Sequence, residues 1–115
     1  MLKQILNEFL SINGVATAAL IGRDGFVIEI VCVDPIDSDA LGVLCTGQMK
    51  FFERCGRELR RGLPRQIVQE YQDGTLLIIP VTWDEFLVVL TNTNSGLGHL
   101  AQTLPKMSER IAAVI

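Results

Sequence analysis

Residues 15–33 read VATAALIGRDGFVIEIVCV and contain the pattern that decides the fold class. Two apolar runs, 15–21 and 26–33, flank the tetrapeptide Gly22-Arg23-Asp24-Gly25. Both runs are rich in residues that favour strands, and glycine with aspartate favours the tight turns that join antiparallel strands. The stretch therefore predicts a β-hairpin.

Helices are predicted on both sides of this hairpin. Residues 1–12 carry apolar side chains at helical spacing and end at a glycine. A long helix follows the hairpin: acidic and hydroxyl residues at 37–39 can cap its start, and Gly62 provides a left-handed stop after about Arg61. A last helix is expected near the end of the sequence, where Pro105 must kink or split it.

Three further strands are predicted between the long helix and the last one, at 65–71, 75–80 and 86–91. Most strand residues are apolar on both sides of the pleat, as in Leu76–Ile79, so helices should cover both faces of the sheet. In 65–71, polar side chains interrupt the apolar pattern, which indicates a strand at a sheet edge. An edge leaves backbone groups unpaired, and a second copy of the chain can pair with them.

The composition limits the classes of function. The 115 residues are 49% hydrophobic and 20% charged, and their formal net charge is −3. One domain over residues 1–115 is expected, with part of the apolar excess in an interface. The charge does not favour nucleic acid as a partner, and no apolar run approaches the ~18 residues of a membrane span. Three cysteines without metal-ligand spacing predict neither a metal nor a disulfide framework, so a cytoplasmic protein without a cofactor is expected.

The long helix carries two apolar stripes. The stripe expected to cover the sheet consists of Leu41, Leu44, Cys45, Gln48, Phe52, Cys55 and Leu59. The second has the alternating steps of three and four of a helix–helix seam and consists of Gly42, Cys45, Met49, Phe52, Gly56 and Leu59. Each glycine inside a helix costs about 1 kcal/mol relative to alanine, so close approach of a partner helix should offset it. The alternative is that these positions fit under a loop of the same chain.

A dimer interface is therefore predicted from the seam and the edge strand together. Its expected residues are Gly42, Cys45, Met49, Phe52, Gly56, Gln66, Ile67, Val68, Gln69 and Glu70. The opposite side of the long helix carries a basic strip, Lys50, Arg54, Arg57 and Arg61. This strip is either a solvated face that complements the helix dipole or a docking site for an acidic partner.

Several local motifs together resemble the roadblock/LC7 family across nearly the whole chain. They are Ile12-Asn13-Gly14-Val15, the hairpin 20–28, Leu87-Val88-Val89-Leu90-Thr91 and Gly96-Leu97-Gly98. The start of the last helix resembles the bacterial and archaeal members more than the dynein light chain.

The resemblance implies an α+β, profilin-like fold of order α-β-β-α-β-β-β-α. In it, a five-stranded antiparallel sheet has the long helix on one face and the terminal helices on the other. It also implies a homodimer formed through the third strands and the long helices. Family members act as scaffolds and regulators of small Ras-like GTPases, and one bacterial branch stimulates hydrolysis by its partner.

The expected function is therefore regulation of a GTPase rather than catalysis by this chain. A purely structural adaptor subunit is the alternative. The stretch Gly96–Ala101 matches a dinucleotide-binding pattern, but the expected topology supplies no parallel strand after it. His99 is the only histidine and is expected at the surface. Trp83 lies in a turn and is either a cover over the core or a partner contact.

Overall fold

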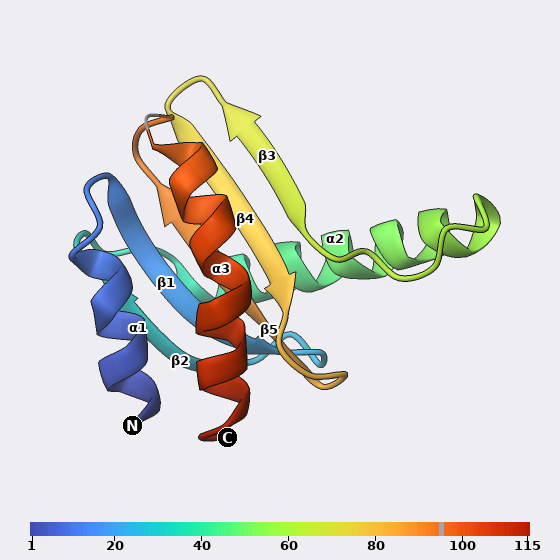
Figure 1. The fold of residues 1–115 in the computed structure, drawn as a ribbon, viewed down its shortest axis with the longest axis horizontal. Helices are drawn as coiled ribbons and strands as arrows, with labels where there is room; N and C mark the ends of the chain where they lie inside the picture. Colours follow the sequence, from blue (N-terminus) through green and yellow to red (C-terminus); the bar gives the residue numbers. More distant parts are fainter. Residues whose placement is uncertain (95) are drawn as a thin grey trace.

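The computed structural model describes residues 1–94 and 96–115, and its elements follow the predicted order (Figure 1). Ser95, which belongs to the expected start of the last helix, lies outside the described residues. The bounds are α1 (Leu2–Leu10), β1 (Val15–Gly22), β2 (Val27–Cys32), α2 (Ser38–Glu58), β3 (Ile67–Tyr71), β4 (Gly74–Pro80), β5 (Glu85–Thr91) and α3 (Leu97–Ala112).

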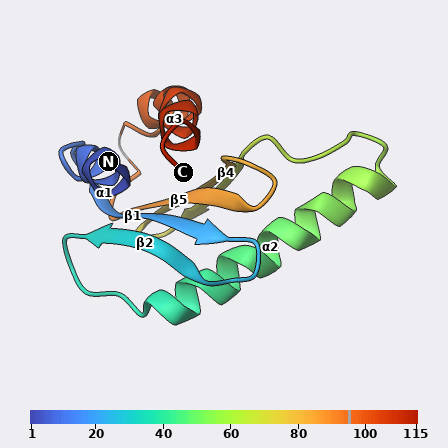
Figure 2. The same cartoon turned by 90° about the horizontal axis from the view of Figure 1, so that it is seen from below.

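The strands form one antiparallel sheet in the order β2-β1-β5-β4-β3. Figure 2 shows α2 on one face and the terminal helices α1 and α3 on the other. Alternate residues of the central strands point to opposite faces, so β4 contributes Leu77 to the cluster under α1 and α3 and Ile78 to the cluster under α2. The predicted α+β fold is confirmed.

The two edge strands differ in regularity. In β2, the pairing with β1 shifts register between Leu20 and Ile21, which leaves Ile28 as a bulged and exposed residue. In β3, the pairing with β4 is continuous from Ile67 to Tyr71. A bulge twists an edge and hinders further pairing. The outer edge of β3 is therefore the better template for another strand.

Two helix boundaries differ from the expectation. The helix α2 ends at Glu58 rather than near Arg61, because Arg60 already adopts the left-handed conformation with φ 56°. The amides of Arg61 and Gly62 then donate to the carbonyl of Gly56, which closes the helix end. Of the two expected effects of Pro105, a kink or a split, the split is wrong, since α3 continues through the exposed Pro105 as one helix.

The helix α2 crosses the sheet at the end that holds the β1–β2 and β4–β5 turns. Gly42 lies so close to this hairpin that an added Cβ would be 2.2 Å from the carbonyl oxygen of Gly25. The hydroxyl of Thr46 lies 3.5 Å from the carbonyl oxygen of Gly22. Beyond these contacts, the C-terminal part of α2 extends past the sheet (Figure 1). One end of the sheet is thus covered, and the C-terminal end of the helix projects beyond it.

Candidate protein-interaction surfaces

The structure confirms only part of the stripe expected against the sheet, since Leu41 and Cys45 are buried there whereas Leu44 and Leu59 are exposed. Gly42, Cys45 and Met49 belong to the buried part of the chain, with Cys45 fully buried and Met49 3% exposed against the sheet. The expectation that these three form a seam with a partner helix is therefore corrected. Gly42 and Gly56 are explained within the chain, because an added Cβ would lie 2.2 Å from the carbonyl oxygen of Gly25 at the first and 1.8 Å from that of Gly62 at the second.

An exposed apolar row on one side of α2 combines four residues of the stripe expected against the sheet with Phe51, which neither expected stripe contained. We call it the seam flank: Leu44, Gln48, Phe51, Cys55 and Leu59, at steps of four, three, four and four. Leu44 is 63% exposed, Phe51 61% and Leu59 67%. Large exposed apolar side chains at the spacing of a helix–helix contact favour a partner surface over a solvated one.

An unsatisfied polar atom lies in the same row. The side-chain oxygen of Gln48 is shielded from solvent and has no hydrogen-bond partner among the described residues. Leaving such an acceptor unpaired costs about 1–3 kcal/mol. A donor from another molecule would remove this cost.

A second row, which we call the outer face, lies one residue earlier in each turn and points away from the sheet. It consists of Val43, Gly47, Arg54 and Glu58, all exposed. Arg54 donates to Glu58 at 3.2 Å, which is an exposed i, i+4 pair. Apart from its chain neighbours and the adjacent backbone of α2, no described atom lies within 4 Å of a Cβ added at Gly47, so no contact with another element explains this glycine.

β3 lies nearest to the projecting part of α2 at Ile67, the first residue of the strand. A groove of about 370 Å³ runs between them, lined by Phe52 and Gly56 of the helix, Gln66, Ile67, Val68 and Gln69 of the edge, and the loop 61–64. Ile67 is buried toward α2, whereas Val68 and Glu70 are exposed. The structure thus brings Phe52, Gly56 and the predicted edge residues 66–69 together, whereas Glu70 is not part of the groove lining.

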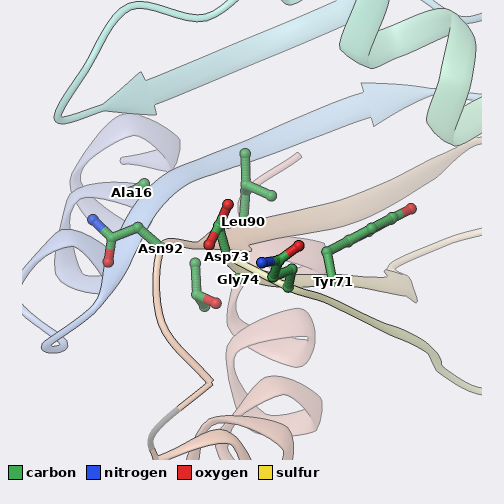
Figure 3. Close-up of a pocket in the computed structure, with 8 residues that line it drawn as sticks. Ala16, Tyr71, Asp73, Gly74, Leu90 and Asn92 are labelled. Atoms are coloured by element: carbon green, nitrogen blue, oxygen red, sulfur yellow. The ribbon is translucent and has the colours of Figure 1, made fainter.

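The opposite end of β3 has a hollow on the part of the sheet that α2 leaves uncovered (Figure 3). Its volume is about 540 Å³, and it is lined by Ala16, Leu90, Thr91, Asn92 and the segment 71–74. Leu90 belongs to the apolar layer beneath α2, which places the hollow on the helix side of the sheet. The hollow is lined mainly by apolar surface and is continuous with the edge strand.

The basic strip does not form one continuous face. Lys50 and Arg57 flank Glu53 on the side of α2 nearest the turns, and both cations contribute to lowering the pKa of that carboxyl. Arg54 lies on the outer face, and Arg61 lies beyond the end of the helix, where its guanidinium donates to the carbonyls of Leu59 and Arg60.

Glu53 is buried within α2 and forms an ion pair that the sequence patterns did not indicate. Arg23 of the β1–β2 turn donates both terminal nitrogens to its two carboxylate oxygens. The Arg23 hydrogen bonds lower the pKa of Glu53 against the opposing effect of burial. The same guanidinium donates through Nε to the carbonyl of Trp83 at 2.7 Å and lies 3.9 Å from the centre of the Trp83 ring. Trp83 therefore covers an arginine, not the apolar core, and remains 62% exposed.

The remaining candidates contribute no further site. Asp37 caps α2 by accepting from the amide of Ala40 at 3.1 Å, and His99 is exposed at the start of α3. Gly96–Ala101 follows an antiparallel strand, so it lacks the parallel crossover of a dinucleotide site. Within 1–94 and 96–115, no three histidine, cysteine or acidic side chains gather as a metal site, and no helix is apolar and long enough to cross a membrane.

Comparisons with known proteins agree with this architecture. The chain is 26% identical over 114 residues to the uncharacterized protein MJ1340 of Methanocaldococcus jannaschii, covering 99% of each. Its fold is similar to the gliding protein MglB of Thermus thermophilus, with a TM-score of 0.90, 22% identity, and coverage of 98% of this chain and 87% of that one. It is also similar to profilin II of Acanthamoeba castellanii, with a TM-score of 0.68, 16% identity, and coverage of 96% and 95%.

The family model of the Roadblock/LC7 domain matches residues 1–91, which include the sheet and the whole of α2. The remaining element, α3, packs against the sheet where the resemblance places the last helix. The chain therefore belongs to the Roadblock/LC7 family.

Proposed function

We propose that this protein is a homodimeric regulatory module that binds a small Ras-like GTPase and modulates its cycle. The observation that carries the proposal is the pair of incomplete surfaces on one side of the molecule: the exposed apolar seam flank of α2 and the regular free edge of β3. The resemblance to the family supplies the expectation that such a dimer serves a GTPase.

Pairing of two β3 edges has a definite geometric consequence. An antiparallel pair of identical strands in one continuous sheet is related by a twofold axis perpendicular to the sheet, so both copies of α2 lie on the same face. The rotation also brings the Ile67 end of one β3 beside the Tyr71 end of the other. A dimer of this kind joins the two sheets without burying any helix between them.

The projecting part of α2 and the hollow of the sheet are complementary under this rotation. Within one chain, Phe52 and Gly56 lie near the Ile67 end of β3, whereas the hollow lies at the Tyr71 end. Each projecting helix therefore reaches the uncovered hollow of the other copy. The seam flank would then face its counterpart across the axis, where Phe51 becomes buried and Gln48 gains a partner.

The GTPase is assigned to the outer face of the two helices. In the proposed dimer, Val43, Gly47 and Arg54 of both chains remain exposed on one side. Catalysis belongs to the GTPase: a rigid surface accelerates hydrolysis when it holds the partner's own loops in their reactive positions. Donation of an arginine from the basic strip is the competing route, and Arg57→Ala separates the two by losing stimulation while keeping binding.

Two charge substitutions on neighbouring rows test the proposal. Phe51→Glu on the seam flank should convert the dimer to a monomer, because it places two carboxylates in an apolar contact. Val43→Glu, on a side chain of similar exposure, should leave the dimer intact and weaken binding of a small GTPase encoded beside this gene. Light scattering and a pull-down with the GTP-loaded protein measure the two effects. A dimer that never binds a GTPase would favour the structural adaptor.

A further inference from the structure

The groove of about 370 Å³ between α2 and β3 lies beside the free edge of the sheet. Ile67 and Gln69 line it from the strand, so both point to the face that α2 covers. Tyr71 shares this face, because its hydroxyl donates to the side-chain oxygen of Gln69 at 2.9 Å. Val68 and Glu70 therefore point to the opposite face. The groove and the ring of Tyr71, which is 55% exposed, thus lie on one face at the two ends of β3.

The twofold axis of the proposed dimer limits how two copies of β3 can pair. The axis is perpendicular to the sheet, so each side chain of the second copy stays on the face that it has in the first. Residues directly opposite each other in an antiparallel pair share a face. Odd-numbered residues must therefore oppose odd-numbered residues, and the axis passes through one residue rather than between two. Away from the ends of the strand, that residue is Val68, Gln69 or Glu70.

Of these three positions, Gln69 suits the axis best. An axis at Glu70 would place two carboxylates directly opposite each other, which is destabilising. An axis at Val68 would leave Glu70 and Tyr71 without a strand residue opposite them, since β3 begins at Ile67. An axis at Gln69 pairs the whole of Ile67–Tyr71 with the same stretch of the other copy.

The charges near the edge are compatible with this register. Each Glu70 lies opposite Val68 of the other copy, and the two carboxylates are diagonal neighbours at about 7–8 Å, exposed to water, where their repulsion is small. Beyond the paired residues, the end that carries exposed Arg65 comes beside the end that carries exposed Asp73. Glu109 of α3 lines a hollow together with Arg65, but the two form no ion pair among the described residues.

The register also provides an occupant for the groove. Tyr71 of one copy comes opposite Ile67 of the other, where an aromatic ring can pack against the apolar lining next to Phe52. The oxygen of each Gln69 accepts from Tyr71 of its own chain and keeps a second lone pair for the amide of the other Gln69. Arg61 is the charged residue of the groove lining, and its guanidinium already donates to carbonyls of its own chain.

The contact between the helices agrees with the same axis. The seam flank extends from Leu44 to Leu59, so its midpoint lies between Phe51 and Phe52. Phe52 and Gln69 line the same groove. An axis at Gln69 therefore passes near the middle of the seam flank as well as through the middle of β3.

We propose that Gln69 lies on the twofold axis of the dimer and that Tyr71 of each copy completes the groove between α2 and β3 of the other. The inference rests on the proposed function for the dimer itself and adds its register. Moving the axis to a neighbouring residue shifts the pairing by two residues and removes the contact between Ile67 and Tyr71. The groove is thus a site for a second copy of this chain in one register.

Single cysteines on the edge strand test the register. Cys32 and Cys55 are first replaced by serine, whereas the buried Cys45 is retained. In this background, Gln69→Cys should give a disulfide-linked dimer with oxidised glutathione, because directly opposite Cβ atoms lie about 4.5–5.5 Å apart. Val68→Cys and Glu70→Cys are the matched controls. Their copies are diagonal neighbours at about 7–8 Å and should remain single chains on a non-reducing gel.

The outcomes separate the register from the dimer. A linked dimer from Val68→Cys or Glu70→Cys in place of Gln69→Cys would overturn the register and leave the dimer intact. Absence of all three links in a protein that sediments as a dimer would overturn the pairing of the β3 edges. An unmodified protein that sediments as a monomer would refute the proposed function together with this register.

Two changes of an aromatic residue to alanine test the occupant of the groove. Tyr71→Ala should raise the dissociation constant of the dimer by about tenfold or more, since tyrosine is enriched at interaction hot spots. Trp83→Ala removes a ring of similar exposure from the β4–β5 turn and should dimerise as the unmodified protein does. Circular dichroism establishes that both variants are folded. Equal dimerisation of the two variants would overturn the assignment of Tyr71 to the groove.

Discussion

The glycines of α2 allow a sharp test of which face of the helix meets its own chain. Alanine is about 1 kcal/mol more favourable than glycine inside a helix, and this gain should be the same at Gly47 and Gly56. A methyl group at Gly47 meets no atom within 4 Å, so Gly47→Ala should stabilise the fold by about 1 kcal/mol. A methyl group at Gly56 would lie 1.8 Å from the carbonyl oxygen of Gly62 and 3.0 Å from its carbonyl carbon.

Both atoms that this methyl group would meet belong to the backbone of Gly62, so the loop 61–64 must move as a whole. Overpacking of this kind costs typically about 1–3 kcal/mol, and the 1.8 Å approach favours the upper end. After subtraction of the helix gain, Gly56→Ala should destabilise the fold by about 2 kcal/mol. The two variants should then differ by about 3 kcal/mol although the chemical change is the same.

Urea unfolding followed by circular dichroism measures this difference, with protein concentration held constant because association contributes to stability. Gly42→Ala serves as a second clashing position, because its methyl group would lie 2.2 Å from the carbonyl oxygen of Gly25. If Gly56→Ala were as stable as Gly47→Ala, the close approach of the loop 61–64 to α2 would be wrong. Gly56 would then again require a partner helix.

Three further predictions concern the ion pair, the interface and the thiols. Glu53→Gln should destabilise the fold by about 1–3 kcal/mol above neutral pH, since Arg23 loses its charged partner. The pKa of Glu53 in the folded protein lies below its unfolded value of 4.5, so the ion pair contributes its full stability above pH 4.5 and loses it as pH falls through the lower, folded-state pKa. In Glu53→Gln, the free energy of unfolding should therefore decrease less between neutral and acidic pH than in the unmodified protein. Phe51→Glu should make the measured mass independent of protein concentration, whereas retention of a dimer would remove Phe51 from the contact. Burial raises the pKa of Cys45 to about 11, so a thiol reagent near neutral pH should modify exposed Cys32 and spare Cys45 until unfolding, as mass spectrometry can determine.

The fold was predictable because local signals along the chain agree with one another. Gly22–Gly25 requires a turn between two apolar runs, and Asp37 is placed to cap the helix that follows. The polar residues within 65–71 correctly indicated that this strand lies at the edge of the sheet. Each of these signals acts within a few residues, so it does not depend on distant packing.

The assignment of the α2 stripes failed for a physical reason. Two adjacent rows of the helix are both apolar, and periodicity alone does not decide which one faces the sheet. The glycines at 42 and 56 did mark close approach, but the approaching groups are carbonyls of the same chain. Only the three-dimensional path of the β1–β2 turn and of the loop after Arg60 determines this.

The Arg23–Glu53–Trp83 cluster had no signal in the sequence patterns. Its hydrogen bonds join residues 30 and 60 positions apart, and each residue has an ordinary local explanation in a turn or a helix. A glutamate on the mainly apolar buried side of α2 is the one clue that could have indicated a missing cation.

Sedimentation equilibrium over a wide concentration range determines whether the protein associates through the seam flank and the edge of β3. We expect a mass of twice the 12.7 kDa of the chain, and the mass of a single chain in Phe51→Glu. A protein that remains a monomer at the highest concentration would contradict it, since the seam flank and the edge of β3 would then be surfaces that nothing covers.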